Sequence, residues 1–161
     1  MSGKVRVAPA AGTHAVERLA GNLIGLRVAE IRSVEEIETL VRRLMALVEL
    51  QPPTVVCCDY RGLRTLDDET AAAAVQAMRA VNAKLQRSAV LLPGSSSNLR
   101  LQIERLCRDA RDAGSPRRRV CSDAAEAKAW LGSSLDEEER RALDRFLASG
   151  DAARGLVSDR P

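Results

Sequence analysis

Hydrophobic residues recur at helical spacing in several stretches of the chain. After Ser33 and Glu36, which have the spacing of a capping box, apolar side chains follow every three or four residues from Ile37 to Val48. This pattern predicts an amphipathic helix that ends before Pro52. Similar patterns predict four more helices: an Ala-rich helix capped by Asp67 or Asp68, one after the loop 94–98, one capped by Asp123 and Glu126, and one that Ser134 and Glu137 open and Gly150 ends.

Short apolar runs lie between these helices and predict strands. Residues 54–58 are bounded by Pro53 and Asp59 and are typical of a strand buried on both faces. Further strands are expected at 88–92 and 119–121, and segments 5–7 and 23–31 are expected to open the sheet as an antiparallel pair.

The order of these elements predicts the fold class. Strand and helix alternate from Thr54 onward, and right-handed crossovers then give a parallel sheet. We therefore expect an α/β fold with a mixed, mainly parallel sheet of four to five strands, flanking helices and an extra C-terminal helix at about 135–149. With 161 residues, the chain fits one domain over 1–150, and we expect 151–161 to be a flexible tail.

Composition and charge narrow the function classes. Hydrophobic residues make up 45% and charged residues 29%, as in globular proteins. The net charge is only +3 and aromatic residues are 2%, which argues against nucleic acid as a partner. No apolar run reaches the length of a signal peptide or of a membrane span, so we expect no membrane association.

The cysteines indicate neither a metal site nor disulfides. Cys57, Cys58, Cys107 and Cys121 include no CxxC pair and lie in apolar surroundings. Buried free thiols and a reducing cytoplasm are the expectation, with no metal and no cofactor.

Catalytic residues are not indicated either. His14 is the single histidine, and no GxSxG motif accompanies the serines at 95–97. We expect a surface histidine and a protein that is not an enzyme.

Two features could hold an anion. The loop formed by Gly94, Ser95, Ser96, Ser97 and Asn98 precedes a helix N-terminus, where backbone N–H groups attract anions, although turn and capping chemistry explains its composition equally. The run Arg117–Arg119, with Arg108 and Arg111, is the densest basic patch and could grip phosphates or an acidic partner, or could be a solvated face.

The segment from Asp59 to Thr70 resembles the signature of the STAS domain, the fold of anti-sigma-factor antagonists. It contains a strand, Asp59, apolar residues at Leu63 and Leu66, and then Asp67, Asp68 and Glu69 at a helix start. The order of elements is similar over about residues 20–132. This resemblance implies a non-enzymatic regulatory module that docks a protein partner, of the kinase-like or anti-sigma type, through Asp59, Arg61, Asp67, Asp68, Glu69 and Thr70.

The chain departs from the family at the phosphorylation site. In the family the second serine of this loop is phosphorylated, whereas here Asp68 and Glu69 stand in the two serine positions and Thr70 in that of a glycine. Glu69 places a fixed negative charge at the helix start, which could imitate a phosphoserine or simply cap the helix.

Two further questions stay open. The C-terminal helix has no counterpart in a minimal STAS domain, so it either covers a face of the sheet or mediates self-association as a homodimer. The alternative function is a small-ligand or lipid-binding domain that uses apolar space beneath the helices together with the loop 94–98.

Overall fold

A computed structural model describes residues 14–50, 54–111 and 117–158, with side chains up to Asp151. It has a five-stranded sheet in the order β1-β2-β3-β4-β5. Only the first pair is antiparallel, and the other three pairs are parallel. The strands are β1 (Ala15–Ala20), β2 (Leu23–Arg27), β3 (Thr54–Asp59), β4 (Leu85–Leu91) and β5 (Arg117–Cys121). The expected α/β fold with a mixed, mainly parallel sheet is confirmed, and β3 is its central strand.

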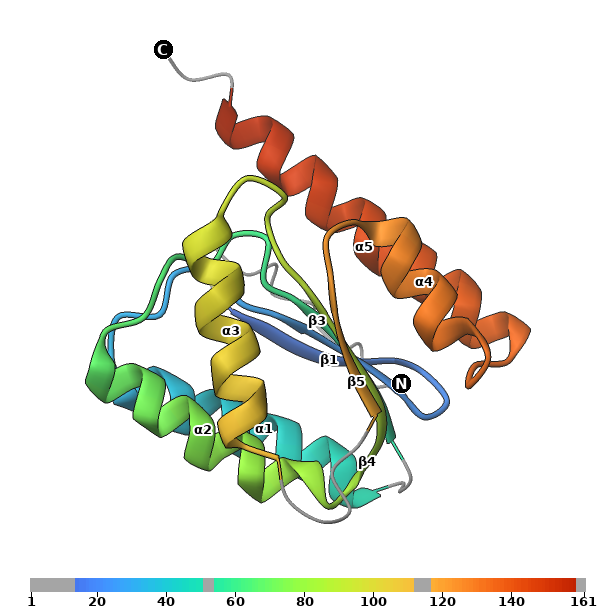
Figure 1. Cartoon of the computed structure of the whole chain (residues 1–161). Helices are drawn as coiled ribbons and strands as arrows, with labels where there is room; N and C mark the ends of the chain where they lie inside the picture. Colours follow the sequence, from blue (N-terminus) through green and yellow to red (C-terminus); the bar gives the residue numbers. More distant parts are fainter. Residues whose placement is uncertain (1–13, 51–53, 112–116, 159–161) are drawn as a thin grey trace, which may run out of the picture.

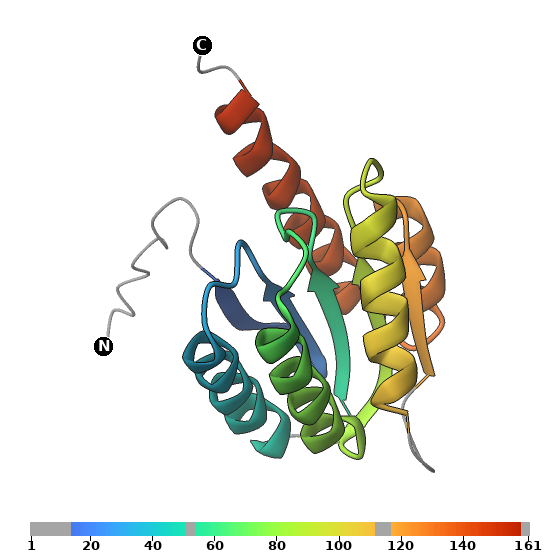
Figure 2. The ribbon, with the colours of Figure 1, turned by 60° about the vertical axis from the view of Figure 1, so that its left-hand side comes forward.

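Five helices cover the two faces of this sheet. They are α1 (Val34–Leu50), α2 (Asp68–Asn82), α3 (Ser97–Asp109), α4 (Ala124–Gly132) and α5 (Glu137–Ser158). The helices α1, α2 and α3 lie on one face, and α4 and α5 lie on the other (Figure 1, Figure 2). The C-terminal helix therefore covers a face of the sheet, which is one of the two roles that the sequence left open.

The antiparallel opening differs from the prediction. The partner of β2 is β1, which pairs Ala15 with Arg27 and Ala20 with Leu23, and the predicted strand 5–7 lies outside the described residues. Charged side chains interrupt the apolar pattern of β1, so its sequence carries little strand signal. The turn between the two strands needs Gly21, whose φ is +49°.

Alternation along the strands divides the core into two layers. Val56 and Cys58 belong to the layer beneath α1, α2 and α3. Val55 and Cys57 belong to the layer beneath α4 and α5, with Phe146 from α5. The two adjacent cysteines thus point to opposite faces of β3, as the sequence predicts.

Most predicted caps are present. Ser33 accepts a hydrogen bond from the Glu36 amide, Asp67 from the Thr70 amide, and Asp123 from the Glu126 amide. The N-terminus of α3 is capped in the same way by Ser96.

The predicted ends of the C-terminal helix are wrong. Its capping box is formed by Asp136 and Glu139, not by Ser134 and Glu137. The helix also continues through Gly150 to Ser158, so much of the expected tail is helical. A glycine inside a helix costs only about 1 kcal/mol relative to alanine, and tertiary contacts can outweigh that cost.

No helix within the described ranges is both long and apolar enough to cross a bilayer.

Candidate partner-binding site

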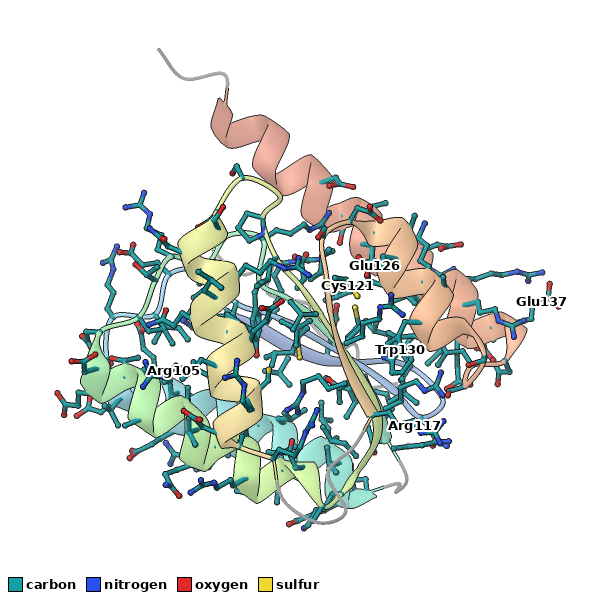
Figure 3. The ribbon with its side chains drawn as sticks, in the orientation of Figure 1. Arg105, Arg117, Cys121, Glu126, Trp130 and Glu137 are labelled. Carbon is teal, nitrogen blue, oxygen red and sulfur yellow. The ribbon has the colours of Figure 1, made fainter. Side chains whose placement is uncertain are left out.

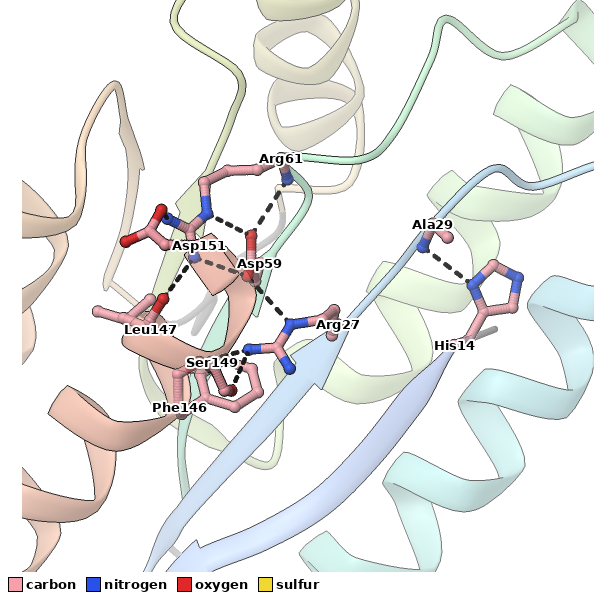
Figure 4. A network of polar contacts seen from close by, with 9 residues as sticks. All are labelled: His14, Arg27, Ala29, Asp59, Arg61, Phe146, Leu147, Ser149 and Asp151. Atoms are coloured by element: carbon pink, nitrogen blue, oxygen red, sulfur yellow. Dashed lines mark hydrogen bonds and ion pairs between the residues drawn. The ribbon is translucent and has the colours of Figure 1, made fainter. Parts of the chain in front are cut away.

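The loop that follows β3 begins at a buried carboxylate. Asp59 is 3% exposed and lies at the end of the central strand. Its Oδ1 accepts hydrogen bonds from the backbone N and Nε of Arg61, and its Oδ2 accepts from Arg61 Nη2 and from Nε of Arg27 on β2. Figure 4 shows the two guanidinium groups on either side of the carboxylate. Both oxygens are fully hydrogen-bonded, as a buried charge requires.

The two arginines determine the charge state of Asp59. Burial by itself would raise the pKa of Asp59, but the hydrogen bonds and charge of Arg61, together with the hydrogen bond from Arg27, lower that pKa below its ordinary value. The carboxylate is therefore ionised at neutral pH, and its charge holds both arginines.

Both arginines also hold the C-terminal helix. Arg27 donates from Nη2 to the Phe146 carbonyl and lies over the Phe146 ring, 4.3 Å from its centroid. Arg61 donates to the Leu147 carbonyl at 2.9 Å and pairs with Asp151 at 2.6 Å. The Asp59 cluster, which we define as Arg27, Asp59 and Arg61, thus connects two strand ends to α5.

Gly150 permits this contact. A Cβ atom at position 150 would lie 2.5 Å from Arg61 Nη2 and closer still to Oδ2 of Asp59. The absence of a side chain therefore lets the arginines reach carbonyls that lie one turn earlier in the helix. This close approach explains why a glycine lies inside α5.

A second contact fixes the other end of α5. Glu139 is 7% exposed, and its Oε2 accepts a hydrogen bond from the Asn22 amide in the β1–β2 turn at 3.0 Å. Its Oε1 accepts from the Asp136 amide. The first turn of α5 is thereby held against the hairpin.

The middle of the loop is fixed by one buried side chain and one amide. Leu63 is 5% exposed and packs in the core beneath α1, α2 and α3. Gln102 of α3 donates from Nε2 to the Leu66 carbonyl and accepts at Oε1 from the Leu66 amide, both at 2.8 Å. The loop is therefore a preformed structure held at its root, middle and end.

The end of the loop is an acidic helix N-terminus. Asp67 caps α2, and its hydrogen bond from the Thr70 amide lowers the pKa of its carboxyl group. Thr70 is 3% exposed, so its hydroxyl is not at the surface. Asp68 and Glu69 are exposed, and neither side chain makes a hydrogen bond or ion pair with the described residues. We call the exposed residues Arg64, Thr65, Asp67, Asp68 and Glu69 the acidic turn.

The candidate anion loop lies at the same edge of the sheet. Gly94 and Ser95 are exposed after β4, Ser96 caps α3 through the Leu99 amide, and Ser97 and Asn98 are the first residues of that helix. Because β3 and β4 are parallel neighbours, the loops that follow them emerge at one edge. Gln102 links α3 to Leu66 and joins the two loops.

The six predicted partner-binding residues fall into two groups. Asp59, Arg61, Asp67 and Thr70 hold the backbone, whereas Asp68 and Glu69 face solvent. Sequence reasoning missed Arg27, Gln102 and Gly150, since these residues come from other elements and no local pattern connects them to the loop.

His14 was expected at the surface, but its side chain is 14% exposed and Nδ1 accepts a hydrogen bond from the Ala29 amide.

No model of a known protein family matches this sequence, and no curated protein is significantly similar to it.

Proposed function

We propose that this chain is a non-enzymatic regulatory module of the STAS type that binds a protein partner through the acidic turn. The observation that carries the proposal is the combination of a rigid loop and exposed charges. The Asp59 cluster, Leu63 and Gln102 fix the backbone. A preformed loop loses little conformational entropy on binding, which favours affinity.

The charge of the acidic turn indicates the kind of surface that it contacts. Asp68 and Glu69 add two carboxylates at the positive end of the α2 dipole, so the turn is acidic without modification. In this proposal Glu69 acts as a permanent substitute for a phosphoserine and selects a partner with a basic surface. A partner of the kinase-like or anti-sigma type is the class that the sequence resemblance implies.

Affinity capture with matched charge variants tests the proposal. The wild type, Glu69→Lys and Glu138→Lys are immobilised, and the proteins retained from native lysate are quantified by mass spectrometry. Glu138 is the control because it is an exposed acid in the first turn of another helix, α5.

The expected result is a protein that the wild type and Glu138→Lys retain and that Glu69→Lys loses. Glu69→Ser, with and without phosphorylation, then tests the phosphoserine comparison, and phosphorylation should restore retention. Retention that is equal in all variants, or no specific retention at all, would reduce the acidic turn to a helix cap.

A further inference from the structure

A cavity lies beneath the segment from Asp59 to Thr70, which we call the docking loop. The cavity has a volume of about 100 Å³ and lies between the sheet and the helices α1, α2 and α3. Most of its lining is aliphatic, with Leu44, Val56 and Ile103 among the contributors. Tyr60, Ser88 and Arg118 add polar groups to this lining. We call this space the apolar cavity.

Arg118 also lines a second space. This space has a volume of about 400 Å³, and Arg108, Arg111 and Arg118 surround it with Asn82, Glu104, Cys107 and Val120. We call it the basic cleft. Because Arg118 belongs to both linings, the apolar cavity and the basic cleft lie against the same side chain.

Strand geometry separates Arg118 from its neighbours in the arginine run. Arg119 pairs with Glu126 of α4 at 3.1 Å and lies 5.8 Å from the Trp130 ring centroid, on the face that α4 covers. Successive side chains of a strand alternate, so Arg118 faces α3 instead. Figure 3 shows Glu126 and Trp130 on α4, and Arg117 at the start of β5. The run is therefore not one continuous patch.

The positive charge of the basic cleft is not neutralised by the described residues. Arg118 donates to Oδ1 of Asn82 at 2.7 Å, which is a neutral acceptor. Glu104 is paired with Arg100 at 3.1 Å. Within 14–111 and 117–151, no carboxylate lies at ion-pair distance from Arg108, Arg111 or Arg118. The cleft therefore favours an anion.

Ser88 supplies a buried donor beside Arg118. The two residues are directly opposite one another in the β4–β5 pairing. Ser88 is 1% exposed, and its Oγ makes no hydrogen bond to a nitrogen or oxygen atom of the described residues. Its polar neighbour is the thiol of Cys58, which is a weak hydrogen-bond partner. A buried hydroxyl without a strong partner is unusual and indicates a missing acceptor.

We propose that the apolar cavity and the basic cleft form one binding site for a small amphipathic carboxylate. The carboxylate group accepts hydrogen bonds from Arg118 and Ser88, and the apolar tail enters the cavity beneath the helices. The cavity is smaller than the roughly 150 Å³ that holds a benzene ring, so it encloses about four carbons of the tail, and the carbon next to the carboxylate stays in the basic cleft. This site is distinct from the loop 94–98.

The site adjoins the root of the docking loop. Leu63 and Leu66 belong to the lining of the apolar cavity, and Tyr60 lies next to the Asp59 cluster in the chain. A bound tail would thus contact the inner side of the loop whose outer side carries the acidic turn. The binding proposal itself does not depend on the partner proposed above.

Calorimetric titration with three probes tests the site: hexanoate, 1-hexanol and acetate. Hexanoate has both tail and head, 1-hexanol lacks the charge, and acetate lacks the tail. We expect hexanoate to bind at least about tenfold more tightly than either of the other probes, because charge-assisted hydrogen bonds and tail burial both contribute.

Three variants then assign the two halves of the site. Arg118→Gln should weaken hexanoate about tenfold and leave 1-hexanol unchanged. Ala77→Leu, which fills the cavity from α2, should abolish binding of both probes. Arg117→Gln removes a neighbouring charge outside both linings and should have no effect. Thermal unfolding of each variant checks that it is folded.

The proposal is overturned if wild-type protein binds no hexanoate at about 10 mM, which would indicate a hydrated cavity. Equal affinity for hexanoate and acetate would also overturn it. So would an affinity for hexanoate that neither Arg118→Gln nor Ala77→Leu changes. The wild-type comparison remains decisive even if a variant does not fold.

Discussion

At the scale of single residues, we expect substitution of Asp59 to lower the stability of the protein most. Asp59 is a buried carboxylate that accepts four hydrogen bonds from two arginines. In Asp59→Asn, the amide NH₂ would point donors at arginine donors. Both guanidinium groups would lose the charge of the buried carboxylate, and Arg61 would keep the exposed Asp151 as its counterion. We expect the free energy of unfolding to fall by about 3 to 5 kcal/mol, as measured by urea denaturation. Asp68→Asn, at an exposed site, should change it by less than about 0.5 kcal/mol.

The lowered pKa of Asp59 also predicts how stability depends on pH. A carboxyl group whose pKa is lower in the folded state binds fewer protons there than in the unfolded chain. Its contribution is complete above the ordinary pKa of about 4 and is lost as the pH falls through the lower folded value. When the pH is lowered from about 4, the urea concentration at the unfolding midpoint should therefore decrease more steeply for the wild type than for Asp59→Asn. Parallel pH profiles would contradict this assignment.

Gly150 and Gly132 predict opposite responses to alanine. Helix propensity alone favours alanine by about 1 kcal/mol inside a helix, as at Gly150, and by less at Gly132, which is the last residue of α4. At Gly132 no atom lies within 4 Å of the added Cβ, so Gly132→Ala should increase the free energy of unfolding. At Gly150 the Cβ would overlap the Asp59 cluster, so Gly150→Ala should decrease it by about 1 to 3 kcal/mol despite the gain in propensity. If chemical denaturation shows that Gly150→Ala stabilises the protein as Gly132→Ala does, α5 can move to make room for the added Cβ.

At the scale of elements, sequence pattern predicts regular segments better than the contacts between them. β3 and the second half of β4 were predicted because their apolar runs need no distant partner to be recognised, whereas the start of β4 at Leu85 was missed because Gln86 and Arg87 interrupt its apolar pattern. β1 was missed because its pattern is broken by Glu17 and Arg18. The end of α5 was misplaced because glycine is a common helix terminator, and the close approach that explains Gly150 exists only in three dimensions.

The candidate site follows the same rule. The cap at Asp67 and the exposed acids at Asp68 and Glu69 are local features, and the sequence predicts their places. The pairing of Asp59 with Arg61 spans two residues and could also have been anticipated. The contributions of Arg27 and Gln102 arise from strand order and helix packing, which no local pattern contains.

The clamp between α3 and the docking loop predicts a local change in dynamics. Gln102→Ala removes both hydrogen bonds to Leu66 and leaves its half-buried backbone groups without these partners. We expect the free energy of local opening at Leu66 to fall by about 1 to 3 kcal/mol, so that its amide exchanges hydrogen faster. Hydrogen exchange measured by NMR gives both the exchange rate and this free energy. Exchange at Leu66 that is unchanged relative to wild type would show that Leu63 and the Asp59 cluster hold the loop without the clamp.

At the scale of the whole molecule, the sheet separates two layers that are held differently. The helices α1, α2 and α3 form one layer, and each of them connects two parallel strands of the sheet. The last helix follows all five strands and is fixed through the Asp59 cluster and Glu139. Its C-terminal part extends past the edge of the sheet (Figure 2). Detachment of α5 breaks no strand pairing, so it should need less free energy than opening the other face.

Cys57 and Cys58 report on these two openings separately, because they point to opposite layers. Burial raises the pKa of both thiols, so neither reacts quickly in the closed state. We expect iodoacetamide to modify Cys57 faster than Cys58, as resolved by tandem mass spectrometry. Gly150→Ala should increase the rate at Cys57 and leave the rate at Cys58 nearly unchanged, because it weakens only the attachment of α5. If the two rates are equal and rise together, the chain unfolds as one cooperative unit and the Asp59 cluster contributes to global stability instead.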